Sequence, residues 1–417
     1  MSESPRPTGQ EAVPAGPWPP RSAYLHIPFC HRRCFYCDFA VVPLGDRADG
    51  ASSGSIARYL EQLLAEIAAA PDGPPLSTVY VGGGTPSMLT PAQLGQLLAA
   101  LRARFGLAPG AELSLEMDPA SFDQDRLAGY LAAGVNRVSL GGQSFDDAVL
   151  ERLGRRHRRA DLLQAATWLA AARCRGDLAS WSLDLIQGLP GQDLAGWDAQ
   201  LAQAIALAPP HLSVYDLIVE PGTVFERLER RGQLDLPDAD LAADLMEHTG
   251  RRLGAAGYGH YEISNYAWPG HASRHNRVYW SGAGWWGFGL GATSAPWGER
   301  LARPRTREAY GAWLAEAPFA AGDSASPGMP FDERVLVGLR RREGVRLERL
   351  AAAAGLGAAE LAPLLERWRP YRERGLLRAE GGRWRLSDPE GLALSNAVLR
   401  ELLEWWEERD GLDRPGE

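Results

Sequence analysis

Short apolar runs alternate with longer amphipathic stretches through the first half of the chain. Six of these runs are rich in β-branched or bulky side chains and end at glycine, proline or a polar residue, the pattern of buried strands. They are Tyr24–Phe29, Thr78–Val81, Glu112–Met117, Arg137–Leu140, Trp181–Ile186 and Leu212–Ile218. Helical periodicity fills the gaps at Ile56–Ala70, Pro91–Phe105, Arg126–Ala133, Leu162–Ala172 and Trp197–Leu207. This alternation predicts a parallel α/β sheet, and because six units are too few for a closed eight-stranded barrel, we expect a partial (β/α)6 barrel.

The alternation fades after residue 241. A helical stretch there leads to the strand-like HYEISNYA and then to RHNRVYWSGAGWWGFGLGA, and AAGDSASPGMP indicates a linker. The end of the chain predicts a small helical, winged-helix-like domain, because GLLRAEGGRWRLS has two β runs around a Gly-Gly turn. We therefore expect a disordered tail at 1–20, a barrel at 21–255, an extension at 256–320 and a C-terminal domain at 321–417.

Composition and charge narrow the class of protein. Charged residues make up 23% and hydrophobic residues 45% of the chain, as in soluble globular proteins. The net charge is −8, so nothing draws the whole molecule to nucleic acid or to an anionic membrane. No apolar run is long enough for a transmembrane helix, and the first residues lack the apolar core of a signal peptide. We expect a cytoplasmic protein.

Three of the four cysteines lie in AYLHIPFCHRRCFYCDF, spaced C-x3-C-x2-C at Cys30, Cys34 and Cys37. Such clustering in a long chain argues against a disulfide framework and for a metal site. Structural zinc prefers four ligands, so a zinc site would need a histidine such as His26 or His31 as well. The alternative is a 4Fe–4S cluster that three thiolates hold, with one iron left open.

Polar residues and glycines follow the predicted strands. Gly82, Gly83 and Gly84 come after the second strand, and Glu116, Gln143 and Asp184 end later ones. Because ligand sites of parallel α/β folds lie at the carboxyl ends of the strands, these residues are expected to share one pocket. For any one of them the alternative is a satisfied polar group at a strand end.

The cysteine spacing resembles that of radical S-adenosylmethionine (SAM) proteins. In that superfamily the amino and carboxylate groups of SAM bind the open iron of the cluster. The motifs YLHIPFCHRRCFYC, GGGTPS, LEMDP, GGQSFDD, LDLIQGLPGQ and LSVYDLIVEPGT resemble, more specifically, the family of oxygen-independent coproporphyrinogen III oxidase (HemN) and its relatives. That resemblance implies that Cys30, Cys34 and Cys37 hold the cluster. It implies SAM contacts at Tyr24, Tyr36, Gly83, Gly84, Thr85, Glu116, Gln143, Arg155, Asp184 and Ile218.

Two branches of this family differ just after the third cysteine. The oxidase branch has a fourth cysteine where this chain has Phe39, and it carries an additional N-terminal segment. The other branch, the HemW-type haem chaperones, lacks that cysteine and has an H-N-x-x-Y-W motif, which matches His275, Asn276, Tyr279 and Trp280 here. One departure is Thr293, where that branch is expected to have histidine.

The resemblance implies a haem carrier that passes haem to respiratory proteins, with a 4Fe–4S cluster, SAM and haem as cofactors. It leaves enzymatic activity and dimerisation open. The alternatives are an oxidase acting on coproporphyrinogen III and a zinc-stabilised binding module. His275 is the candidate haem ligand, because histidine is a common axial ligand and tryptophans are concentrated nearby. Packing beneath the cluster domain is the alternative role for this histidine.

Overall fold

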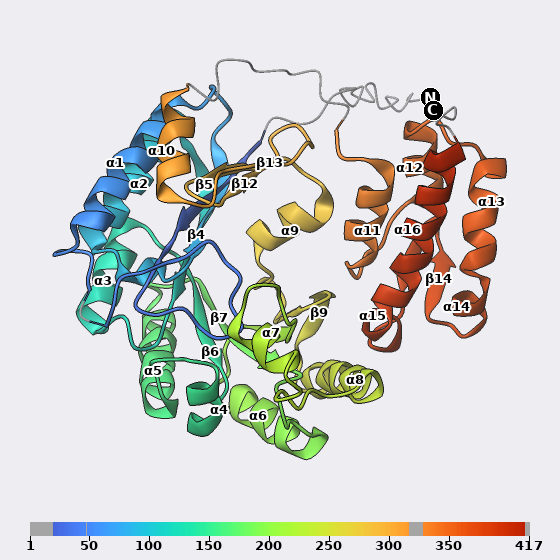
Figure 1. Ribbon diagram of the computed structural model, residues 1–417, viewed down its shortest axis with the longest axis horizontal. Coiled ribbons are helices and arrows are strands. Elements are labelled where there is room, and N and C mark those ends of the chain that lie inside the picture. Colours follow the sequence, from blue (N-terminus) through green and yellow to red (C-terminus); the bar gives the residue numbers. More distant parts are fainter. Residues whose placement is uncertain (1–19, 47, 317–327, 413–417) are drawn as a thin grey trace, which may run out of the picture.

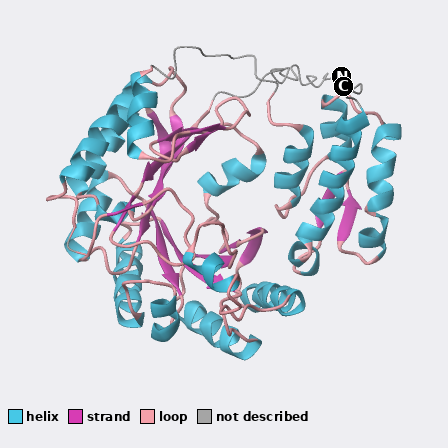
Figure 2. Cartoon of the chain, in the orientation of Figure 1, coloured by secondary structure: helices cyan, strands magenta, loops and turns pink. Residues whose placement is uncertain are grey.

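The computed structural model describes residues 20–46, 48–316 and 328–412, so the predicted tail and most of the predicted linker lie outside it. All six predicted strands form, and consecutive ones pair in parallel. They are β1 (Ser22–Ile27), β4 (Leu76–Gly83), β5 (Leu107–Met117), β6 (Arg137–Gln143), β7 (Ser180–Gln187) and β8 (His211–Asp216). The prediction of an α/β partial barrel is therefore confirmed (Figure 1, Figure 2).

Three further strands, all from the segment expected to be an extension, widen the sheet at both edges. Strand β11 (Trp286–Phe288) pairs in parallel with β1, and the hairpin of β9 (Gly259–Glu262) and β10 (Asn265–Ala267) pairs antiparallel with β8. The strand order is β11-β1-β4-β5-β6-β7-β8-β10-β9. Residues of the segment such as Trp286 and Phe288 belong to the barrel core, so the segment is part of the barrel.

Helices cover the convex side of the sheet (Figure 1). The predicted ones are α1 (Gly54–Ala69), α2 (Pro91–Arg104), α3 (Gln124–Ala133), α5 (Arg159–Arg175) and α6 (Leu194–Ala206); α4 (Asp147–Arg152), α8 (Ala239–Ala255) and α10 (Arg307–Ala315) add to them. The short helix α7 (Val224–Glu229) instead lies against the segment that carries the cysteines. Local signals set their ends. The side chains of Thr90 and Gln93 form a capping box at the start of α2, and Gly176 ends α5 in the left-handed conformation that glycine favours.

The two faces of the sheet differ in polarity. Side chains such as Leu25, Val79 and Leu115 point to the helices and are fully or almost fully buried in the core. Alternate residues of the strands, such as Tyr80 after Val79 and Glu116 after Leu115, point to the inner side of the curved sheet, as do Ser139 and Asp184 on the next two strands. A filled barrel would carry bulky apolar residues on that side as well. A polar inner face therefore indicates a barrel that is built to hold a polar ligand.

The C-terminal domain packs on the hairpin edge of the barrel. It comprises α11 (Phe331–Leu339), α12 (Leu347–Ala353), α13 (Ala358–Arg367), α14 (Arg369–Glu373), β14 (Leu377–Glu380), β15 (Arg383–Leu386), α15 (Glu390–Ala393) and α16 (Ser395–Leu412) around a separate apolar core. The amide of Ile263 donates to the carbonyl of Arg340 at 2.9 Å, and that of Arg342 donates to Tyr261 at 3.2 Å. These backbone bonds fix the domain beside the barrel. Within the described residues, no helix is both long and apolar enough to span a membrane.

Candidate cluster and cofactor site

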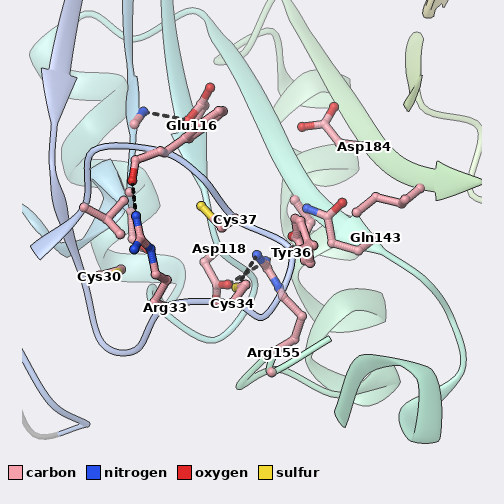
Figure 3. Close-up of a pocket in the computed structure, with 18 of the residues that line it drawn as sticks. Cys30, Arg33, Cys34, Tyr36, Cys37, Glu116, Asp118, Gln143, Arg155 and Asp184 are labelled. Carbon is pink, nitrogen blue, oxygen red and sulfur yellow. Dashed lines mark hydrogen bonds and ion pairs between the residues drawn. The ribbon is translucent and has the colours of Figure 1, made fainter. Parts of the chain in front are cut away.

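A cavity of about 370 Å³ opens at the carboxyl ends of the parallel strands (Figure 3). The structure brings almost the whole predicted set to its wall. Cys30, Cys34, Tyr36, Cys37, Gly83, Gly84, Thr85, Glu116, Gln143, Arg155, Asp184 and Ile218 all line it. The exception is Tyr24, whose hydroxyl lies 2.9 Å from Nδ1 of His26 and whose ring stacks on Tyr80. Tyr24 therefore supports a residue of the wall without being part of it.

The cysteine loop is fixed by backbone hydrogen bonds to distant parts of the barrel. The amide of Phe35 donates to the carbonyl of Leu153 at 3.0 Å, and the amide of Phe225 donates to the carbonyl of Phe35 at 3.1 Å. A small apolar cluster that includes Leu153, Ile186 and Phe225 packs against Tyr36. At its start, β2 (Phe29–Cys30) pairs with β3 (Val42–Pro43). The loop is thus held at both ends and in the middle.

The thiols of the loop suit an iron–sulfur cluster in their chemistry. Burial and the neighbouring Cys34 and Cys37 raise the pKa of Cys30 to about 12, and burial also raises the pKa of Cys37. Metal binding would therefore have to displace protons from these thiols. Among the described residues, no three His, Cys, Asp or Glu side chains converge closely enough to hold a single metal ion. Three soft sulfur donors beside a large cavity match the ligand type of a cluster.

Glu116 is anchored at the glycine-rich end of β4. Its Oε2 accepts from the amide of Gly83 at 3.0 Å, and its Oε1 accepts from the hydroxyl of Tyr80 at the same distance. A Cβ at Gly82 would lie 2.9 Å from Oε1, so only glycine leaves room for the carboxylate there. Burial raises the pKa of Glu116 to about 7. The carboxylate is positioned to receive a cationic group of a ligand.

Serine hydroxyls hold Asp184 on the inner face of β7. The hydroxyl of Ser139 donates to Oδ2 at 2.7 Å and that of Ser182 donates to Oδ1 at 3.2 Å. Burial raises the pKa of Asp184, although these hydrogen bonds oppose the shift. An acceptor fixed by its own strand and by the neighbouring β6 is suited to a ligand that presents hydroxyl groups.

A backbone irregularity directs Gln143 into the cavity. The register between β6 and β7 shifts between Gly141 and Gln143, which marks a bulge, and Gln143 has a φ of +64°. Few residues other than glycine adopt this conformation, and such positions cluster at functional sites. Because a bulge changes the direction of a side chain at a sheet edge, it explains how a residue at the end of β6 reaches the cavity.

Arg155 is part of an ionic group whose other members the sequence reasoning missed. Its Nη2 lies 2.7 Å from Oδ2 of Asp118, and Nη1 lies 3.8 Å from Sγ of Cys34. Burial opposes ionisation of Asp118, but Arg155 and His157 hold its pKa well below the usual range. The buried His157 lies with Nε2 3.0 Å from the carbonyl oxygen of Gly142. Asp118 follows Glu116 by two residues at the end of the same strand, and this spacing could have revealed it.

The H-N-x-x-Y-W motif lies on α9 (Arg274–Ser281), on the inner side of the sheet (Figure 1). His275 is fully buried. Its Nδ1 lies 2.8 Å from the hydroxyl of Thr78, its Nε2 lies 2.8 Å from that of Tyr279, and its ring stacks on Tyr80. Burial lowers the pKa of His275 to about 3. Because both ring nitrogens are engaged inside the protein, this geometry favours packing as the role of the side chain, and the haem contact stays a prediction.

A chain of contacts links this motif to the cavity. The ring of Tyr80 lies between His275, on which it stacks at 5.2 Å, and Glu116, to which it donates its hydrogen bond. The amide of His275 in turn donates to Oε1 of Glu112 at 3.0 Å, so α9 is held against β5 as well. Thr293, where histidine was expected, lies in the short strand β12 (Thr293–Ser294), and its carbonyl accepts from the indole of Trp285 at 2.8 Å.

The partial barrel and a three-cysteine loop above a polar cofactor pocket define a radical SAM protein. Residues 24–199 match the model of the radical SAM superfamily, and residues 331–393 match that of the HemN C-terminal domain. The chain is 41% identical to heme chaperone HemW of Synechocystis sp. over 93% of its length and 98% of that protein. It is 35% identical to the Bacillus subtilis HemW over 92% of its length and 99% of the relative. The chain belongs to the HemW family.

A solved structure supports the fold. Coproporphyrinogen III oxidase (HemN) from Escherichia coli superposes with a TM-score of 0.74, covering 93% of this chain and 90% of that one. The two share 24% sequence identity, so the likeness concerns the architecture. It agrees with a partial barrel followed by a C-terminal helical domain.

Proposed function

We propose that this protein binds a 4Fe–4S cluster and SAM in the barrel cavity and carries haem for delivery to other proteins. The observation that carries the proposal is the cavity itself, where three cysteines of one fixed loop face carboxylates and a guanidinium. The haem part of the proposal is supported by the HemW relatives, which are heme chaperones. The same role is proposed for this chain.

Each group on the cavity wall has a part in this proposal. Cys30, Cys34 and Cys37 would hold the cluster and leave one iron open to SAM. A cluster held there would, once reduced, supply an electron to the sulfonium of SAM. The proposed SAM contacts are Tyr24, Tyr36, Gly83, Gly84, Thr85, Glu116, Gln143, Arg155, Asp184 and Ile218, with Tyr24 acting through its neighbours.

The chemistry of SAM fits the polarity of this wall. Its ammonium group suits the Glu116 carboxylate and the nearby glycine backbone, and its ribose hydroxyls suit Asp184. Arg155 offers a positive charge to the carboxylate of SAM, while Asp118 keeps the guanidinium oriented. The apolar side chain of Ile218 would contact the adenine ring.

A carrier is preferred to a coproporphyrinogen III oxidase because of Phe39 and because of the greater identity to HemW proteins. In the HemN family the oxidase branch has a further cysteine at that position. The proposed partners are haem and haem-accepting respiratory proteins, and we include a homodimer as one state of the carrier. His275 has no part in the proposed haem contact, since its two ring nitrogens are engaged inside the protein.

The decisive experiment starts from protein purified without oxygen. We expect about four iron and four sulfide per chain, SAM binding that changes the electron paramagnetic resonance spectrum of the reduced cluster, and saturable binding of one haem. Coproporphyrinogen III should not be converted at catalytic rates. Absence of haem binding by cluster-loaded protein, or turnover of coproporphyrinogen III, would refute the carrier function.

A further inference from the structure

Large apolar side chains are exposed around the mouth of the cofactor cavity. Phe39 is 54% exposed, Tyr215 is 43% exposed and Ile218 is 65% exposed, and all three line the cavity. Elsewhere in the described chain, strongly exposed side chains of this kind are few and belong to separate elements, such as Leu194 on α6 and Leu403 on α16. Apolar side chains that gather at one opening mark a binding surface, whereas single ones need no explanation.

Two arginines flank Phe39 on the surface. Arg33 donates a hydrogen bond to the backbone carbonyl of Phe39 at 2.7 Å, and Arg305 donates to that of Asp38. Both side chains belong to exposed residues, and neither is joined to a carboxylate by an ion pair among the described residues. Neighbouring Arg32, in contrast, is paired with Asp46 at 2.8 Å. Arg33 and Arg305 therefore keep their charge available to a ligand while their position is fixed by the backbone.

The exposed ring of Phe39 and the two arginines beside it together indicate the chemistry of the ligand. An exposed aromatic ring favours a flat apolar partner that can stack on it. Two guanidinium groups beside that ring favour two carboxylates, with which they form charge-assisted hydrogen bonds. Because Asp38 and Glu220 also lie at the mouth, an anionic ligand needs these two cations to bind there.

We propose that haem binds at this mouth, with its macrocycle over Phe39 and its two propionates on Arg33 and Arg305. The inference rests on the proposed haem-carrier function and assigns a place to it. The macrocycle would then cover the entrance of the SAM cavity and contact Ile218 and Tyr215 on the other side. This gives Phe39, the residue in place of the oxidase cysteine, a direct role in binding.

Haem titration of cluster-loaded protein tests the site. Phe39→Ala and the double variant Arg33→Gln/Arg305→Gln should each raise the Kd for haem at least about tenfold. Haem dimethyl ester, which lacks free propionates, should bind the wild type weakly, and the double variant should not weaken it further. Iron content and SAM affinity should stay at wild-type values in all variants. Leu403→Ala and Arg369→Gln, which change exposed residues of the C-terminal domain, serve as matched controls.

The outcomes separate this inference from the function on which it rests. If the wild type does not bind haem, the carrier function itself fails. If the wild type binds haem and the mouth variants bind it equally well, haem lies elsewhere and the inference is refuted. If the mouth variants keep haem but change the monomer–dimer equilibrium in size-exclusion chromatography, the surface binds a second copy of the chain, which also refutes it.

Discussion

The mouth of the cofactor cavity and the α9 motif on the inner side of the barrel are opposites in structure, although both combine aromatic rings with basic side chains. At the mouth, Phe39 is more than half exposed, and the guanidinium of Arg33 bonds to a backbone carbonyl. On α9, His275 is fully buried and both ring nitrogens bond to hydroxyls. A buried polar group whose hydrogen bonds are all satisfied stabilises the fold, whereas an exposed apolar ring gains free energy only when something covers it.

A ligand can lower the free energy of the molecule most where side chains still lack contacts. The contacts of His275 are complete without any ligand, so its contribution is made when the chain folds. Those of Phe39 and Ile218 are incomplete, so their contribution is made on binding. Substitutions in the two regions should therefore separate stability from ligand binding.

The largest expected effect is the loss of iron and sulfide when a cysteine of the loop beside the mouth is replaced. Cys34→Ser removes a proposed cluster ligand, and we expect iron and acid-labile sulfide to fall to background with the loss of visible absorbance. Cys174→Ser is the matched control, since Cys174 is exposed on α5. Wild-type iron content in the Cys34 variant would rule out this loop as the cluster site.

His275→Ala should lower the free energy of unfolding by about 3 kcal/mol, because it leaves a cavity and two buried hydroxyls without their partner. Through Tyr80 and Glu116 it should also weaken SAM binding, while one haem per chain should still bind. Urea denaturation and haem titration measure the two effects. His248→Ala, at a partly exposed histidine paired with Asp198, should change stability by less than about 1 kcal/mol. Loss of haem binding at unchanged stability would reverse the comparison between the two regions.

Glu116 connects the two regions, and its pKa predicts a dependence of stability on pH. Its pKa is about 7 in the folded protein against 4.5 in the unfolded chain, so the folded state binds the extra proton between these values. Stability without SAM should therefore fall by about 1–2 kcal/mol as the pH rises from about 4.5 to 7, allowing for partial solvation of the pocket. Glu116→Gln should remove this part of the slope in urea titrations at several pH values. An identical slope in the variant would show that other groups cause it.

The smallest expected effect is on stability at the mouth. Phe39→Ala should leave the free energy of unfolding within about 0.5 kcal/mol of the wild-type value, because little packing is lost. Phe288→Ala, at a fully buried phenylalanine of β11, should lower it by about 3–5 kcal/mol. Thermal and urea denaturation compare the pair. Strong destabilisation by Phe39→Ala would mean that this ring has a structural role.

The sequence predicted the six parallel strands and the pocket because both depend on local patterns. Apolar runs followed by glycine or polar residues appear directly in the chain, and parallel strands bring such ends together. β11 was not predicted as a strand, since its three residues lie in a glycine-rich run and gain their partners only from β1. The burial of His275 depends on Thr78, which is 197 positions away in sequence, so no local pattern reports it. The bulge at Gln143 also depends on a distant partner, because it arises where β6 pairs with β7.

The pairing of β1 with β11 has a consequence for synthesis of the protein. Ala23 pairs with Trp286, so one edge of the first strand stays without its partner until about 260 more residues have left the ribosome. During that interval the nascent barrel exposes unpaired backbone groups at β1, a template for pairing with other chains. Completion of the barrel is therefore a late event in translation, and a chain truncated before residue 286 would be prone to aggregation.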